Sequence, residues 1–148
     1  GGRVGGWTIS CLTTAEGITG RIGGNMLGAD VDLKVDRDVG LITGRIGGAV
    51  IGKTVNVKFD SDRLRGRLGG TAIGWDVFLY GTERITGRWG GPVIGFDCNL
   101  VVSQGFLVGR LGGAIVGRSV DMTLSKDFPP VVSALIAAMT CQYFRSTR

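Results

Sequence analysis

The residues in this sequence best suited to chemistry are six arginines, each within a pentapeptide Gly-Arg-x-Gly-Gly in which x is Val, Ile, Leu or Trp. The guanidinium group stays charged and can bind phosphate or carboxylate through paired hydrogen bonds. Successive arginines are 18, 24, 22, 21 and 22 residues apart, so the repeating unit is about one β-hairpin long. The arginines are Arg3, Arg21, Arg45, Arg67, Arg88 and Arg110.

We predict that most of these arginines have a structural role, as a belt of ion pairs on the solvent face of a sheet. Exposed pairs contribute roughly 0 to 1 kcal/mol each, but a network of them can fix strand register. The expected contacts join Arg21 to Asp30 or Asp32, Arg88 to Asp97, and Arg110 to Asp121. The predicted belt comprises Arg21, Arg45, Arg67, Arg88, Arg110, Asp30, Asp32, Asp76, Asp97 and Asp121.

Cations exceed acids in one stretch of the chain, where only Asp60, Asp62 and Glu83 oppose them. Such an excess suits phosphate head groups or an acidic partner. Aromatic and apolar residues with the parity of the outer face, among them Val101 and Val108, add a contact surface of the kind that partners cover. The predicted anion-binding or partner surface comprises Lys58, Arg63, Arg65, Arg67, Arg84, Phe78 and Phe106.

Enzyme chemistry is disfavoured because the sequence has no histidine, which is the commonest general base and a frequent zinc ligand. No Gly-Gly pair precedes a helix with the Gly-Lys-Ser/Thr ending of a phosphate-binding loop. Paired acids such as Asp60 and Asp62 are typical turn residues. We therefore predict no catalytic residue, no metal site and no cofactor.

Charge and cysteine content indicate the compartment and the partners. The net charge of +5 is spread along the chain without a stacking motif for bases, so nucleic acid is an unlikely partner. Three widely spaced cysteines do not predict a disulfide framework and favour a reducing, cytoplasmic compartment. No apolar run reaches the roughly 18 residues of a membrane span. The sequence begins without Met, so a removed leader and a secreted protein stay open as alternatives.

The elements that position these residues are short strands. Units two to six align without gaps, and each alternates polar and apolar residues with a period of two, as in Asp30-Val31-Asp32-Leu33. Turn residues separate the alternating segments. Six hairpins, and so about twelve antiparallel strands, are predicted over residues 1–125.

A helix is predicted over residues 129–144, where two prolines precede a segment that is apolar almost all round. Asp127 is placed to help cap it. Because this segment is too short to span a bilayer, we expect it to be buried inside the protein. The first glycine of each motif faces the core, and we interpret it as clearing space for this helix.

Together these elements predict one domain, an antiparallel up-and-down barrel wrapped around the C-terminal helix. A β-trefoil or prism is the second alternative, although a trefoil has three equivalent units and this chain has six. A solenoid is third, because it would stack like-charged arginines about 4.8 Å apart.

Strands around a hydrophobic C-terminal helix resemble the tubby-like superfamily, which includes LURP-one-related and phospholipid-scramblase-like proteins. The segment from Val120-Asp121-Met122 to Asp127-Phe128-Pro129-Pro130-Val131 is similar to the end of LURP-one domains. The resemblance implies the barrel fold and binding of phosphoinositides, and it assigns no residue of this chain to that binding.

The function predicted from the sequence is a non-enzymatic binding or scaffold module that acts through its outer surface on an anionic membrane or a protein partner, including a second copy of the chain. A self-assembling or secreted structural protein is the alternative, and an enzyme of unknown chemistry is third. Function is expected where the repeats differ, at Trp75, Phe78, Trp89, Phe106 and residues 63–67.

Overall fold

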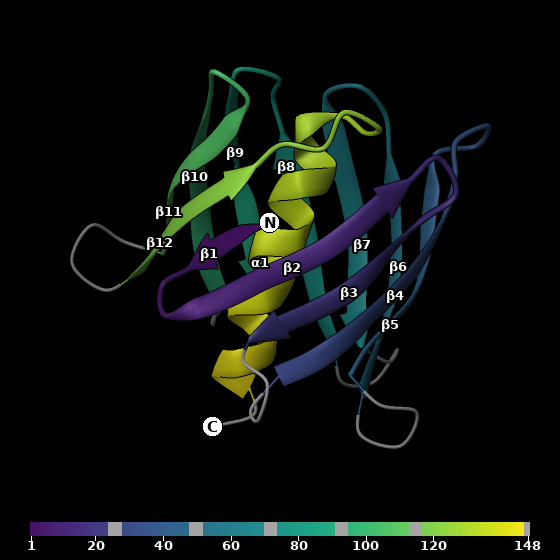
Figure 1. The fold of residues 1–148 in the computed structure, drawn as a ribbon, viewed down its shortest axis with the longest axis horizontal. Coiled ribbons are helices and arrows are strands. Elements are labelled where there is room, and N and C mark those ends of the chain that lie inside the picture. Colours follow the sequence, from purple (N-terminus) through teal and green to yellow (C-terminus); the bar gives the residue numbers. More distant parts are fainter. Residues whose placement is uncertain (24–27, 48–51, 70–73, 91–94, 113–116, 147–148) are drawn as a thin grey trace.

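The computed structural model describes residues 1–23, 28–47, 52–69, 74–90, 95–112 and 117–146, with side chains of the helix described as far as residue 142. Over these residues the chain forms a closed antiparallel barrel of twelve strands around one helix (Figure 1). The predicted barrel and its helix are therefore confirmed.

Consecutive strands are neighbours throughout, and β1 closes the barrel by pairing with β12. The strands are β1 (Gly2–Val4), β2 (Trp7–Thr14), β3 (Gly17–Gly23), β4 (Gly28–Asp36), β5 (Leu41–Gly47), β6 (Gly52–Phe59), β7 (Arg63–Gly69), β8 (Gly74–Tyr80), β9 (Arg84–Gly90), β10 (Gly95–Ser103), β11 (Phe106–Gly112) and β12 (Gly117–Thr123). The helix α1 is Pro130–Ser146.

Alternation of apolar and polar residues accounts for the strands. In β4, Val31 and Leu33 are buried and face the helix side, while Asp30 and Asp32 are exposed on the outer wall. Successive side chains of a strand point to opposite faces, so a period of two gives every strand one apolar face. Twelve such faces enclose a single apolar core.

The first glycine of each motif is needed for a different reason from the one predicted. Gly44 adopts a φ of +148°, and an added Cβ would lie 2.1 Å from the carbonyl oxygen of Asp32 and 2.8 Å from Cα of Leu33, both on the neighbouring strand β4. The preceding strand is likewise the nearest obstacle at Gly20, Gly66, Gly87 and Gly109. The interpretation that these glycines clear space for the helix is therefore wrong, because they permit close approach of two strands.

From Val131 to Gln142 the helix is buried on all sides, as its composition predicts. Every side chain from Val131 to Gln142 is buried, and the hydroxyl of Thr140 donates to the carbonyl oxygen of Ile136 at 2.8 Å. Small residues such as Ala134 and Ala137 let the helix fit against the barrel wall. The carboxylate of Asp127, expected at the helix cap, accepts a hydrogen bond from the Thr13 hydroxyl at 3.0 Å and so joins the entry to the helix to β2.

Candidate functional site

The motif arginines point outward, and the register of the strands determines which side chains on the neighbouring strands they contact. The Nη1 atom of Arg21 lies 2.7 Å from Oδ1 of Asp30. The corresponding distances are 2.9 Å from Arg67 to Asp76 and 3.3 Å from Arg88 to Asp97. All six side chains are well exposed to solvent, so each pair contributes little to stability.

Two positions of the predicted belt differ from expectation. Arg110 donates to the Ser119 hydroxyl at 3.1 Å, because Ser119 is its cross-strand neighbour on β12. Asp121 lies instead opposite Val108 on β11 and Arg3 on β1, so the predicted contact between Arg110 and Asp121 is wrong in register. Arg45 lies between Thr54 on β6 and Asp32 on β4.

On the preceding strand, the residue directly opposite each motif arginine is polar, with one exception. Five of the six motif arginines have a polar residue as the direct cross-strand neighbour there, and the sixth has an aromatic ring. The neighbouring pairs are Ser10 with Arg21, Asp32 with Arg45, Asn56 with Arg67, Phe78 with Arg88, Asn99 with Arg110 and Asp121 with Arg3. The regular belt is therefore interrupted at Phe78.

A second departure from the repeat lies beside the first. Arg65 occupies the outward position two residues before the motif arginine, where the other repeats carry Thr19, Thr43, Thr86 and Val108. It is directly opposite Phe78 on β8 and directly opposite Lys58 on β6. The outer wall thus carries one continuous row, Lys58, Arg65, Phe78 and Arg88, which we call the cationic row.

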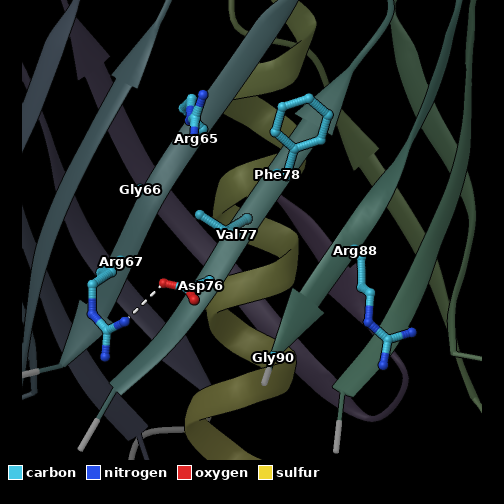
Figure 2. Close-up of a pocket in the computed structure, with 8 residues that line it drawn as sticks. All are labelled: Arg65, Gly66, Arg67, Asp76, Val77, Phe78, Arg88 and Gly90. Carbon is cyan, nitrogen blue, oxygen red and sulfur yellow. Dashed lines mark hydrogen bonds and ion pairs between the residues drawn. The ribbon is translucent and has the colours of Figure 1, made fainter. Parts of the chain in front are cut away.

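An open depression of about 600 Å³ lies along this row on the outer wall (Figure 2). Figure 2 shows Arg65 and Phe78 projecting from β7 and β8, with Arg88 on the far side of the hollow and Arg67 turned toward Asp76. Gly90 lies directly opposite Asp76, and because glycine has no side chain, nothing projects from the wall at this position. The depression is lined by Arg65, Gly66, Arg67, Asp76, Val77, Phe78, Arg88 and Gly90.

The charges around the depression are unevenly neutralised. Arg67 and Arg88 each have an aspartate partner, whereas within the described ranges neither Lys58 nor Arg65 makes an ion pair or a side-chain hydrogen bond. Like charges directly opposite on neighbouring strands repel each other. Lys58 and Arg65 therefore form an uncompensated pair of cations at one end of the row.

The nearby acid Asp60 is engaged in its own turn. Its Oδ1 atom accepts the backbone N–H groups of Asp62 at 3.1 Å and Arg63 at 3.0 Å. The hydrogen bonds from Asp62 are the main cause of the lowered pKa of Asp60, and the Arg63 backbone and charge add to the effect. The carboxylate is thus held in the turn between β6 and β7.

An exposed aromatic pair stands next to the cations. Phe78 remains 43% exposed, and its ring centroid lies 5.5 Å from that of Tyr80, two residues further along β8. Tyr80 is directly opposite Arg63. A large apolar ring exposed between arginines is the kind of surface feature that partners cover.

The remaining predicted surface residues lie elsewhere. Arg84 donates to Oδ1 of Asn99 at 2.8 Å on β10, and Phe106 lies on β11, separated from Phe78 by β9 and β10. Trp89 is buried in the core, so it cannot contact an external partner as the sequence interpretation allowed. The structure brings together Lys58, Arg65, Arg67 and Phe78, and it adds Arg88 to the anion-binding candidates.

The thiols offer little reactivity. Burial raises the pKa of Cys98 to about 12, so this thiol stays protonated at neutral pH. Among the residues with described placement, no cluster of three or more His, Cys, Asp or Glu side chains could hold a metal ion. In that same part of the chain, no helix has both the length and the apolar character to cross a membrane.

Fold and site together define the chain as a twelve-stranded antiparallel barrel with a central helix and a cationic row on its outer wall. Comparisons with protein-family models, curated proteins and solved structures gave no significant match. The resemblance to the tubby-like superfamily therefore stays a prediction.

Proposed function

We propose that this protein is a non-enzymatic binding module that attaches to an anionic lipid surface through the outer wall of β6 to β9. The observation that carries the proposal is the cationic row, in which Lys58 and Arg65 lie side by side without an acid and Phe78 replaces the polar residue of the repeat. Each exposed Lys or Arg close to an anionic membrane contributes about 1 kcal/mol to binding.

The aromatic pair supports a membrane over a purely electrostatic partner. Phe78 and Tyr80 stand on the same outer face as the cations, and aromatic rings favour the interface between head groups and acyl chains. Arg65 and Arg88 flank the depression from opposite sides of Phe78 and can each donate to a lipid phosphate. Cations and aromatic rings then act on the same surface.

Vesicle flotation tests the proposal. The wild-type protein is expected to float with vesicles of phosphatidylcholine containing phosphatidylserine and to stay unbound with phosphatidylcholine alone, and the bound fraction should fall as salt rises. Binding that is independent of lipid charge would contradict the proposal.

A matched pair of variants separates the site from net charge. Lys58 and Lys34 occupy the same position of their repeats, and Lys34 lies on β4, away from the row. Lys58→Thr should weaken binding about fivefold, which corresponds to about 1 kcal/mol, and Lys34→Thr should leave it within a factor of two. Equal losses would show that only the overall charge matters.

Self-association is the second candidate, and a separate apolar patch supports it. Val101 and Val108 lie directly opposite each other on β10 and β11, and Phe106 and Val108 are exposed on the same face. Analytical ultracentrifugation at two protein concentrations tests this candidate. A monomer at both concentrations would exclude it and would leave the membrane proposal standing.

A further inference from the structure

The barrel is closed by β1 over only part of its seam. β1 pairs with β2 at Trp7 to Ile9, whereas β2 continues to Thr14 (Figure 1). Ile9 is buried, but Cys11 and Thr13, which face inward from the following positions, are only partly buried. The core is therefore less completely covered beside the second half of β2.

A pocket of about 140 Å³ lies at this seam, and we call it the seam pocket. Its walls come from both sides of the seam and from the first half of α1. Most of the lining is apolar, and hydroxyl groups and one thiol interrupt it. The lining residues are Gly1, Ile9, Cys11, Thr13, Ile18, Met122, Thr123, Leu124, Ser125, Phe128, Val132, Ser133 and Ile136.

Ser133, on the first half of α1, is the most deeply buried polar residue in the lining of the seam pocket. It is 5% exposed, and among the described residues its hydroxyl has no hydrogen-bond partner. By contrast, the hydroxyl of Thr140 on the same helix donates to a backbone carbonyl, that of Ile136. The Ser133 side chain is nine-tenths buried, yet its hydroxyl is open to the pocket, so a molecule in the pocket can supply the hydrogen bond that the described protein groups do not.

The chemistry of the lining favours a neutral ligand. Among the described residues no charged side chain lines the seam pocket, and the N-terminal ammonium group of Gly1, which borders it, donates to the Thr123 hydroxyl at 2.9 Å. Burial is the main cause of the raised pKa of Cys11, which keeps its thiol protonated at neutral pH, although the N-terminal charge and a hydrogen bond from the Arg21 backbone act in the opposite direction. A charged ligand would lose its hydration here without a side chain of opposite charge in the lining.

We infer that the seam pocket binds a small, neutral, mostly apolar molecule that makes one hydrogen bond to the Ser133 hydroxyl. The volume limits the size, because an apolar cavity of about 150 Å³ holds benzene. A ring or branched chain of roughly six to eight heavy atoms with one hydroxyl or carbonyl group fits these limits. Phenol is therefore the probe, and benzene is the matched molecule that lacks the polar group.

The first test is titration of the full chain with each probe, followed by NMR. Phenol is expected to bind saturably and to shift the amide signals of residues around the seam pocket. Ser133→Ala should weaken phenol binding roughly three- to tenfold, as expected for loss of one hydrogen bond, and should change benzene binding by less than twofold. Thermal unfolding of Ser133→Ala checks that the variant stays folded.

The second test follows the Cys11 thiol. Phenol at ten times its dissociation constant should slow alkylation of Cys11 by iodoacetamide about tenfold, as mass action requires when the ligand covers the thiol. Mass spectrometry of the Cys11 peptide separates this reaction from that of the buried Cys98. Absence of saturable phenol binding, equal binding by wild type and Ser133→Ala, or unchanged alkylation would each overturn the inference.

Discussion

Replacing the first glycine of a repeat tests the reason for its presence. The structure attributes this glycine to the neighbouring strand and not to the helix. Gly44→Ala adds one methyl group at a position where Cβ would lie 2.1 Å from the Asp32 carbonyl oxygen and 2.8 Å from Cα of Leu33. Both obstacles are backbone atoms of a neighbouring strand, so they cannot rotate away. The φ of +148° is also one that residues with a side chain rarely adopt.

The expected cost follows from these two terms. Backbone strain at such a φ costs about 1 to 3 kcal/mol. Separating β4 from β5 to relieve the overlap weakens about two ladder hydrogen bonds, each worth about 0.5 to 1.5 kcal/mol. A total of about 2 to 6 kcal/mol is a large part of the stability of an ordinary domain. With an unfolding entropy of about 2.1 cal/mol/K per residue, the midpoint of this 148-residue chain should fall by roughly 6 to 19 °C.

Thermal and urea unfolding followed by circular dichroism measure the change. Gly6→Ala is the matched control, because Gly6 is exposed and an added Cβ there meets nothing within 4 Å. It should shift the free energy of unfolding by less than about 0.5 kcal/mol. Equal midpoints for the two variants would refute the explanation based on close strand approach.

Two further predictions concern the core. Deleting residues 129–148 removes the buried side chains of α1, such as Leu135 and Met139. The shortened chain should therefore lose its dispersed NMR signals and aggregate. A folded monomer would contradict the central-helix account. The folded pKa of Cys98 is raised from 9.0 to about 12, so the unfolded chain loses this proton first and stability falls as pH rises from about 9 to about 12. In urea unfolding across that range, the free energy of unfolding should fall by up to about 1.4 kcal/mol per pH unit. Cys98→Ala should reduce this slope. The same slope in the variant and the wild type would contradict the role given to Cys98.

The barrel could be predicted from the sequence because the polar and apolar residues of each repeat predict its strands independently of the other repeats. The alternation in Asp30-Val31-Asp32-Leu33 and its equivalents fixes which side chains face the core, and the apolar composition around Leu135 fixes that the helix is buried. The role of Gly44 could not be read in the same way. Parity shows that this glycine faces inward, but only the backbone geometry shows that β4 rather than the helix lies too close.

The candidate site was only partly predictable. An excess of cations near Arg65 is visible in the sequence, whereas the inclusion of Arg88 depends on the register of β8 and β9, which places it beside Phe78. Phe78 stands where repeats two, three, five and six carry Asp or Asn, and this substitution is the reason for its place in the predicted surface. The seam pocket left no such signal, since it arises from the short pairing of β1 with β2.

The central claim is that function lies where the repeat is interrupted, and restoring the repeat tests it most directly. Arg65→Thr and Phe78→Asn return both positions to residues found in the other repeats, Thr43 and Asn56, so the barrel should stay folded. In a titration with vesicles containing phosphatidylserine, loss of one cation and one interfacial ring should weaken binding by the double variant about thirtyfold, or about 2 kcal/mol. Binding equal to that of the wild type, with the fold intact, would contradict the claim.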